Sequence, residues 1–373
     1  MTMGRAADVS LEDLTGDPHP HLARLRPLAR VPAIDGFLVT GRTAALEVLR
    51  DAETFTVDDP RFSTSRVVGS SMLSLDGPEH ERHRAAFAGV IRPRDVTDRF
   101  APFVTTAVEH RLDAFGYRDH ADLRTELAAP LAASVVAQTL GLDGRDDAAV
   151  GRLVGWYRAI VASVSAISAG FPPTPVGAEA MDALGEHLRG RLPHGGGLPT
   201  EAMVSNAAVV MFGGIETTEG MILNALWYLL TIPGVLEEVR QHPDLVAAAV
   251  EESLRLEPAA SRVDRFATRP ATVAGTDIEA GSLVVVSLAG ANRDPDEFPD
   301  PDRFDLHRPN GRRHLAFAAG PHLCLGMDLA RLEARTAVAA VLRRLPDVRL
   351  DDDAPPPAGL VFRKPDRLPV HWG

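Results

Sequence analysis

The stretch Phe317-Ala-Ala-Gly-Pro-His-Leu-Cys-Leu-Gly326 decides the interpretation of this sequence, because it contains the only cysteine among 373 residues. A helical pattern from Met327 to Val338 follows at once, which predicts that the Cys324 sulfur lies at a helix N-terminus. Unpaired amides and the helix dipole at such an end favour the thiolate over the thiol. This environment suits a metal ligand. The alternative is a small buried side chain, which is common for a lone cysteine.

Composition excludes several classes of protein. The chain has 39 basic and 51 acidic residues, a net charge of −12, and no basic cluster long enough to follow a phosphate backbone, so we expect no nucleic-acid partner. One cysteine cannot form an intramolecular disulfide, which fits a reducing compartment. Acidic residues in Met1–Asp13 argue against a signal peptide. No segment reaches the ~18 consecutive apolar residues of a membrane helix. We therefore expect a soluble, cytoplasmic protein that contacts no membrane.

Helical periodicity dominates the chain, and a few short segments alternate as strands do. We read this as a mainly α protein with a small β region and a single domain over residues 1–373. A helix from Glu201 to Leu230 would be ~45 Å long and, being apolar almost all round, should be buried. The other expected helices are Thr43–Leu49, 97–169 with breaks near Pro130 and at Gly141–Gly144, and a charged helix over Pro243–Leu256; the expected β segments are Pro32–Val39, Ala271–Val273 and Leu283–Val286.

A long aperiodic loop, Asp58–Leu75, precedes a predicted helix start. Long loops in compact domains are often functional, so this one is a candidate pocket wall. Asp76 is a possible N-cap and Pro78 suits the first turn. In the helix that follows, His80 and Arg84 are four residues apart and share a face.

The long helix contains Gly213-Gly-Ile-Glu-Thr-Thr218. Two glycines in a helix interior cost roughly 1 kcal/mol each relative to alanine, so either another element approaches closely or the helix opens there. The simpler interpretation is close helix packing beside a solvated glutamate. The alternative is a groove for a flat cofactor or a diatomic ligand, with Glu216 and Thr217 handling protons.

Glu252 and Arg255 stand one turn apart in the charged helix. On a protein surface such a pair contributes a few tenths of a kcal/mol, so Glu-x-x-Arg alone is a weak motif.

Four motifs together closely resemble the cytochrome P450 family, in its bacterial, soluble class. They occur in the family's order and with similar separations, and the resemblance covers nearly the whole chain. It implies a single-domain fold shaped as a triangular prism, with haem b between the long central helix and the cysteine-loop helix. The motifs are Gly213-Gly-Ile-Glu-Thr-Thr218, Glu252-Ser-Leu-Arg255, Ala291-Asn-Arg-Asp-Pro295 and Phe317-x-x-Gly-x-His-x-Cys-x-Gly326.

The resemblance implies that Cys324 is the proximal iron ligand and that Glu252 and Arg255 are tied to the meander around Arg293. An axial thiolate donates electron density to iron, and Gly320 and Gly326 would let backbone amides approach the sulfur. Haem propionates are carboxylates that need paired cations when they are buried. For each candidate cation, the alternative is a location on the protein surface without contact to haem. The cofactor-binding residues implied are His80, Arg84, Gly213, Arg265, Phe317, Gly320, His322, Cys324 and Gly326.

Glu216 and Thr217 match the family residues that deliver protons to dioxygen. Family members that run on peroxide typically replace this pair, so its presence implies a dioxygen-dependent monooxygenase that takes two electrons from outside. One cysteine cannot hold an iron–sulfur cluster. We therefore expect a ferredoxin-type donor, with its reductase, at the cysteine-side face.

Two features depart from the family pattern. Ala318 stands where the family usually has a second glycine, and Pro321 stiffens the loop; we expect the loop to survive, with a change in haem orientation or potential. The connection from Arg189 to Thr200 is shorter than usual, so a helix or loop before residue 201 should be reduced.

Matching to the family also suggests the substrate-facing residues, most of which are small or apolar. They predict a compact, largely apolar substrate, with an anionic group bound by Arg66 or Arg262. The alternative places Arg262 on a haem propionate and Arg66 in solvent. The candidate substrate residues are Arg66, Met72, Ala208, Phe212, Arg262, Val361 and Phe362.

The function implied is hydroxylation or epoxidation of a small organic, secondary-metabolite substrate. Oxidative coupling, desaturation and nitration are alternatives within the same fold. A haem-binding sensor or carrier without turnover is a further alternative, and the presence of both Glu216 and Thr217 speaks against it.

Overall fold

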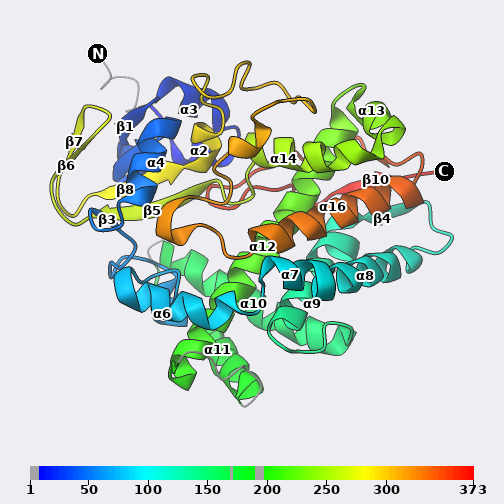
Figure 1. The fold of residues 1–373 in the computed structure, drawn as a ribbon, viewed down its shortest axis with the longest axis horizontal. Helices are drawn as coiled ribbons and strands as arrows, with labels where there is room; N and C mark the ends of the chain where they lie inside the picture. The colour runs from blue at the N-terminus through cyan, green and yellow to red at the C-terminus, as the bar shows by residue number, and fades with distance from the viewer. Residues whose placement is uncertain (1–7, 169–170, 190–196) are drawn as a thin grey trace. The chain divides into compact units, whose positions relative to one another are not determined.

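The computed structural model describes residues 8–168, 171–189 and 197–373 (Figure 1). The chain forms two compact units, each assembled from separate segments. The first contains Met1–Thr56, Val108–Ala128 and Thr217–Gly373, and the second contains Val57–Ala107 and Ala129–Glu216. A single functional domain stays a prediction. Most of the predicted shortened connection, residues 190–196, lies outside the described residues.

The first unit combines helices with all of the described strands. Its α-helices are α2 (Leu11–Thr15), α3 (His19–Arg24), α4 (Arg42–Arg50), α13 (Val235–Gln241), α14 (Val246–Leu256), α15 (Leu288–Ala291) and α16 (Met327–Arg344). Its shorter turns are η1 (Pro32–Ile34), η3 (Arg124–Ala128), η4 (Pro243–Leu245), η5 (Gly311–Arg313) and η6 (Gly320–His322). Its strands are β1 (Leu28–Val31), β2 (Gly36–Val39), β3 (Phe55–Thr56), β4 (His120–Asp122), β5 (Arg262–Ala267), β6 (Ala271–Val273), β7 (Thr276–Ile278), β8 (Leu283–Ser287), β9 (Arg349–Leu350) and β10 (Pro369–His371).

The second unit is helical in the part that the structure describes. It contains α5 (Ser65–Val68), α6 (Gly77–Ala88), α7 (Pro93–Asp95), η2 (Val96–Phe100), α9 (Ala129–Thr139), α10 (Asp147–Ser168) and α11 (Pro175–Leu188). Two helices contribute residues to both units, α8 (Ala101–Asp113) and α12 (Thr200–Thr231).

A five-stranded sheet in the order β1-β2-β8-β5-β3 organises the first unit. β8 pairs in parallel with β2 and antiparallel with β5, so its Val284 and Val286 are fully buried in a core that also includes Val48 of α4. The hairpin β6–β7 extends at the left of Figure 1. A second sheet has the order β4-β10-β9. β5 carries two of the predicted site residues, Arg262 and Arg265.

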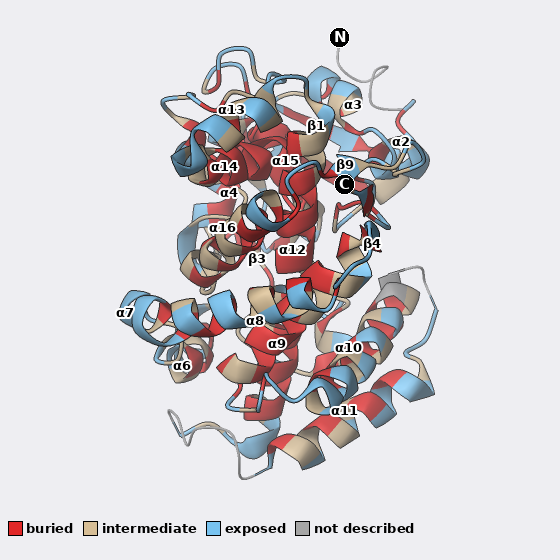
Figure 2. Ribbon diagram, turned by 90° about the vertical axis from the view of Figure 1, so that its right-hand side faces the viewer, coloured by how far each residue is buried: buried red, intermediate tan, exposed pale blue. Residues whose placement is uncertain are grey.

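The long helix is confirmed, since α12 spans Thr200–Thr231 and most of its residues are buried (Figure 2). Among the described residues, no single helix has the length and apolar character to cross a membrane. α12 and α13 meet that criterion only as a pair bent by 104°.

Several local predictions are confirmed and others are wrong. α4, β6 and β8 match their predicted ranges closely, whereas Pro32–Ile34 forms a 3₁₀ turn and only Gly36–Val39 is a strand. The break predicted near Pro130 is wrong. Pro130 lies in the first turn of α9, where a missing amide hydrogen costs least, directly after the π-helical turn η3. The break falls earlier, where β4 forms.

Glu333 of α16 is an unusual buried carboxyl group. Its residue is 4% exposed, and its Oε2 has no hydrogen-bond partner among the described residues. Burial alone raises the pKa of Glu333 well above its usual range. In the folded protein this carboxyl group is therefore neutral at pH values where it ionises in the unfolded chain.

We expect Glu333→Gln to make the protein more resistant to alkaline conditions. The folded pKa is raised, so wild type loses stability as pH rises above the ordinary value of 4.5, by up to about 1.4 kcal/mol per pH unit, until the folded pKa is reached. Urea midpoints measured from pH 5 to pH 9 should diverge in favour of the variant. Glu237→Gln, at an exposed position, is the control, and parallel curves for wild type and Glu333→Gln would contradict the prediction.

Candidate functional site

The cysteine loop is held by its own backbone just before α16. The Phe317 carbonyl accepts a hydrogen bond from the Cys324 amide at 3.0 Å, and the Gly320 carbonyl accepts one from the Leu323 amide at 3.1 Å. Gly326 is the N-cap residue of α16, and the Cys324 side chain is exposed. The predicted position of the thiol at a helix N-terminus is confirmed. The alternative of a small buried side chain is wrong.

Backbone conformation explains two residues of this loop. Gly320 has φ +71°, and an added Cβ would overlap the Leu49 carbonyl oxygen of α4. The structure therefore explains Gly320 by its close approach to α4. The predicted approach of backbone amides to the sulfur is a different reason, and it stays a prediction. Ala318 also has a left-handed conformation, with φ +58°. The loop survives with alanine there, as predicted, at a conformational cost.

Phe317 is clamped between a guanidinium group and an imidazole ring. The Arg331 guanidinium lies 4.5 Å from the centre of its ring, within cation–π range, and the His314 ring centre lies 5.9 Å away. Arg331 Nε donates to Glu251 Oε1 at 2.7 Å, and His314 Nε2 lies 3.2 Å from Glu251 Oε2. One buried carboxylate thus fixes both groups that contact the start of the cysteine loop.

Glu251 is the most heavily bonded carboxylate of this region. It is 5% exposed and also accepts a hydrogen bond from Arg335 at 2.8 Å. Burial acts to raise the pKa of Glu251, but the hydrogen bonds from His314 and Arg331 outweigh it and hold the pKa well below its usual range. Burial also lowers the pKa of His314.

The neighbouring Glu252 holds the meander. It pairs with Arg255 at 2.8 Å and with Arg308 at 2.9 Å, while Arg255 donates to the carbonyls of Asn292 and Arg303, both at 3.0 Å. The predicted tie between the Glu-x-x-Arg pair and the meander is confirmed. The pair is buried rather than superficial, with Arg255 completely inaccessible.

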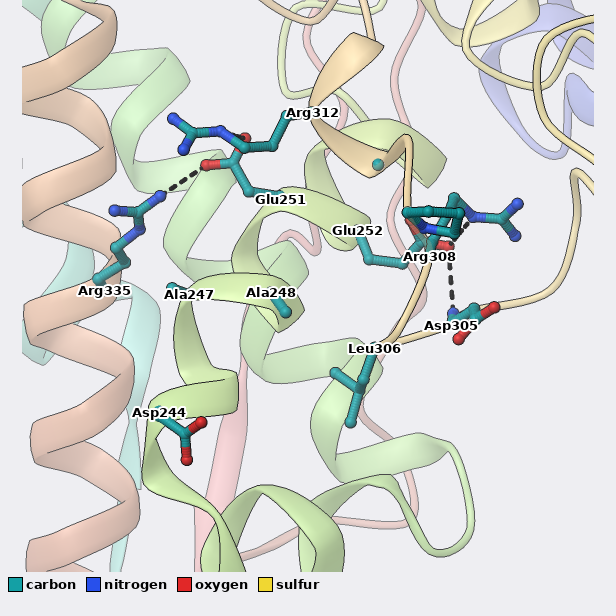
Figure 3. Close-up of a pocket in the computed structure, with 12 residues that line it drawn as sticks. Asp244, Ala247, Ala248, Glu251, Glu252, Asp305, Leu306, Arg308, Arg312 and Arg335 are labelled. Carbon is teal, nitrogen blue, oxygen red and sulfur yellow. Dashed lines mark hydrogen bonds and ion pairs between the residues drawn. The ribbon is translucent and has the colours of Figure 1, made fainter.

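These two glutamates line a cleft of about 340 Å³ (Figure 3). Arg335 and Arg312 lie beside Glu251 in this view, and Glu252 points toward Arg308 and Asp305. The two glutamates and the arginines of the wall already bind one another. We therefore interpret the cleft as the outer side of a structural network.

The glycine pair of α12 has two different surroundings. The helix stays α-helical throughout, so the predicted opening is not found. An added Cβ at Gly214 would lie 2.6 Å from Val136 Cγ2 of α9, which confirms close packing there. At Gly213 no atom of the described residues lies within 4 Å of an added Cβ. Glu216 and Thr217, next along the helix, are both half-buried.

A partner that sequence reasoning missed holds Glu216. The hydroxyl of Tyr157, on α10, donates a hydrogen bond to Glu216 Oε2. The glutamate is therefore not simply solvated.

The N-terminal part of the second unit carries His80 and Arg84 on α6. His80 is 3% exposed, and Arg84, one turn later, is half-buried. Asp76 stands at the N-cap position but does not cap the helix with its side chain; its Oδ2 accepts instead from the Val57 amide at 2.9 Å.

The predicted pocket wall is anchored by Asn206 of α12, which is completely buried. Its Oδ1 accepts from the Met72 amide at 2.8 Å, and its Nδ2 lies 2.9 Å from His83 Nδ1. Arg66, on the short helix α5, is exposed, which fits the solvent alternative for this residue. Phe212 is half-buried, and Ala208 is 1% exposed. In the sequence, the role of Asn206 could have been noticed only because a side-chain amide stands among the apolar residues of the long helix.

β5 separates its two arginines. Side chains three residues apart in a strand point to opposite faces, so Arg262 and Arg265 cannot serve the same face of the sheet. Arg265 is 4% exposed, and Arg262 lies 3.9 Å from Asp264.

The tail lies beside the start of β5. Ala260 forms a β-bridge with Phe362, and the Ser261 amide donates to the Val361 carbonyl at 2.8 Å. The structure thus brings Val361 and Phe362 next to the Arg262 segment. His322, in η6, is half-buried.

Comparison with known proteins gives consistent matches. The family model described as Cytochrome P450 matches residues 179–358. The chain is 35% identical to the cytochrome P450 monooxygenase PikC of Streptomyces venezuelae, over 97% of this chain and 92% of the relative. It is 31% identical to the 20-oxo-5-O-mycaminosyltylactone 23-monooxygenase of Streptomyces fradiae, over 95% and 90%. The crystal structure of P450BioI with hexadec-9Z-enoic acid ligated acyl carrier protein has a TM-score of 0.87 at 29% identity, covering 97% of this chain and 100% of that one.

We expect Ala318→Gly to stabilise the protein by about 0.5–1 kcal/mol. Glycine removes the ~1–2 kcal/mol that a left-handed conformation costs an L-residue. Part of this stabilisation is lost because glycine increases the conformational entropy of the unfolded chain. Ala319→Gly is the matched control, because Ala319 is extended, with φ −157°, and should lose stability. Urea unfolding of both variants checks this, and a loss of stability in Ala318→Gly would contradict it.

We expect Glu251→Gln to destabilise the protein by about 3 kcal/mol at pH 7, because it leaves Arg331 and Arg335 without their buried counter-charge. The folded pKa of Glu251 is depressed, so its contribution is present above the ordinary value of 4.5 and is lost as pH falls below it. Urea midpoints of variant and wild type should therefore converge in acid.

The control for this prediction is Glu238→Gln, which removes an ion pair of which the glutamate is 42% exposed. A surface pair of this kind contributes little. Equal urea midpoints for the Glu251 and Glu238 variants at pH 7 would contradict the role given to Glu251.

Proposed function

The chain belongs to the cytochrome P450 family and is a monooxygenase of that family, and we propose that it hydroxylates or epoxidises a small organic substrate of secondary metabolism. Members of the family bind haem b and use dioxygen. The observation that carries the proposal is the exposed Cys324 thiol, held at the N-terminus of α16 by a rigid loop, in a chain that keeps the Glu216–Thr217 pair in α12.

The residues present fit a haem group. Cys324 is exposed, and the helix end that follows it favours the thiolate that an axial ligand must be. At Gly326 and Gly213, an added Cβ would meet no atom of the described residues within 4 Å, so neither glycine is required by protein packing. Both are positions where a flat cofactor could approach the backbone.

We propose His80, Arg84, Arg265 and His322 as partners for the propionates. Buried carboxylates need paired cations, and His80 and Arg265 are the two members of this set that are buried. The opposite facing of Arg262 and Arg265 supports Arg265 over Arg262. The contacts of Phe317 with Arg331 and His314 would keep the ligand loop in one conformation.

When haem is bound, it supplies the site at which dioxygen is activated with two electrons from the external donor. Glu216 would hold and release a proton at its carboxylate, and the Thr217 hydroxyl, one residue later in the same helix, would pass that proton on. Both side chains are half-buried rather than free in solvent.

The proposed substrate contacts are Met72, the Phe212 region of α12, and Val361 and Phe362 beside β5. Their apolar character supports an apolar substrate, and the exposure of Arg66 does not support an anionic anchor there. One relative is named for its action on 20-oxo-5-O-mycaminosyltylactone, which supports a secondary-metabolite substrate.

We propose a ferredoxin-type protein with its reductase as the electron donor. The single cysteine of the sequence is assigned to the haem iron, so the 373 residues hold no cysteines for a cluster of their own.

We expect reduced wild-type protein with carbon monoxide to show the red-shifted Soret band of thiolate-ligated haem. A band at roughly 420 nm, as imidazole ligation produces, would contradict the assignment. The variants Cys324→Ser and Cys324→His form a matched pair, and both should lack the thiolate band. Haem content, measured separately, distinguishes loss of the ligand from loss of the cofactor.

A further inference from the structure

Tyr157 brings a hydroxyl into a mainly apolar stripe of buried residues on α10, where Ser163 is also buried. The buried residues of this helix follow helical spacing, and a phenylalanine at position 157 would continue the stripe. Burying a hydroxyl costs free energy unless the hydroxyl has a hydrogen-bond partner. The stripe consists of Val150, Leu153, Tyr157, Ile160, Val164 and Ile167.

The partner of this hydroxyl is the carboxylate of Glu216. Tyr157 is 6% exposed, and its hydroxyl donates to Glu216 Oε2. A hydrogen bond to an ionised acceptor is stronger than one between neutral groups. An ionised carboxylate only accepts hydrogen bonds, so the tyrosine must be the donor. The bond therefore fixes the rotation of the carboxylate at one oxygen.

The helix that carries Tyr157 is itself firmly placed within the second unit. α10 packs against α9, α11 and α5. At Gly177 of α11 an added Cβ would overlap Ser163 of α10, and the Ser163 hydroxyl accepts from the Thr174 amide at 2.9 Å. α5 lies in the loop proposed as a substrate wall. Tyr157 thus connects a helix packed on that wall to the acid of α12.

We propose that Tyr157 is a positioning residue for Glu216, whose hydroxyl holds the carboxylate in the orientation needed for proton delivery. The proposal rests on the proposed function of Glu216 and adds a residue that the motif does not contain. Loss of the hydroxyl removes one hydrogen bond that holds the carboxylate in this orientation, so more dioxygen would leave as peroxide before a further proton arrives.

The balance of reduced dioxygen gives a test that needs no known substrate. With a substrate-free holoenzyme, NADPH + H⁺ + O₂ gives NADP⁺ + H₂O₂ when the O–O bond is not cleaved. When it is cleaved, 2 NADPH + 2 H⁺ + O₂ gives 2 NADP⁺ + 2 H₂O. After subtraction of the NADPH oxidation and peroxide formation of reductase and ferredoxin alone, the peroxide formed per NADPH consumed therefore reports on proton delivery by the holoenzyme.

The experiment compares wild type, Tyr157→Phe and Tyr117→Phe, each supplied with NADPH, a ferredoxin reductase and a plant-type ferredoxin. Tyr117→Phe is the matched control, because Tyr117 is fully exposed. We expect Tyr157→Phe to raise peroxide per NADPH by about twofold, toward the limit of one that the first equation sets, because a misplaced acid slows the proton transfer that competes with loss of peroxide. A ratio equal to that of wild type overturns the proposal.

A double-mutant cycle supplies a readout that does not depend on activity. Tyr157→Phe and Glu216→Leu each remove one side of the hydrogen bond, and leucine offers no acceptor. We expect each variant to lower the melting temperature by about 1–3 °C. The double variant should be lowered by clearly less than the sum, and additive shifts overturn the direct coupling of the two side chains.

The two experiments separate the possible failures. If wild type lacks the thiolate band with carbon monoxide, the proposed function fails, and the cycle still decides whether Tyr157 and Glu216 are coupled. If the thiolate band is present and the peroxide ratio of Tyr157→Phe equals that of wild type, only the role of Tyr157 fails.

Discussion

The pairing of two consecutive buried carboxylates, Glu251 and Glu252, is the constraint on which the meander and the cysteine loop of the first unit depend. A buried charge is tolerated only with counter-charges and hydrogen bonds around it. Because the two side chains leave α14 in different directions, one carboxylate organises Arg331 and His314 under Phe317, and the other organises Arg255 and Arg308 against the meander. A single turn of helix therefore fixes both segments that precede the cysteine helix, and removing either charge would leave arginines without their buried counter-charge.

This network explains how a short loop can present a reactive sulfur. Cys324 is exposed, and backbone hydrogen bonds hold its loop. The loop is further held at its start by Phe317, which contacts the Arg331 guanidinium and the His314 ring, and by Gly320, which fits against a carbonyl of α4. The left-handed Ala318 lies between them, and the clamps at either side offset its conformational cost.

The sequence predicted the parts of the fold that local periodicity determines. α12, α4 and the helix after Cys324 follow a regular apolar pattern, and their positions were confirmed. β5 was missed because it reads Arg-Val-Asp-Arg-Phe-Ala, with charges at positions that the sheet half-buries or buries, and its partner β8 can be identified only in three dimensions. The motif residues of the site were predicted because their spacing is local. Glu251, His314, Tyr157 and Asn206 were missed because each acts through a contact distant in sequence.

The missed residues share a physical signature. Asn206 is fully buried in an apolar helix, and Tyr157 brings a hydroxyl into an apolar stripe, so each position would be packed more simply by an apolar side chain. A polar group persists in such a place only with a partner, and the partner here is in each case part of the proposed site: the amide of Met72 in the pocket wall, and the carboxylate of Glu216. The motifs therefore identify the groups proposed to carry out the chemistry, and the polar exceptions in the buried helix faces identify side chains that contact the proposed site.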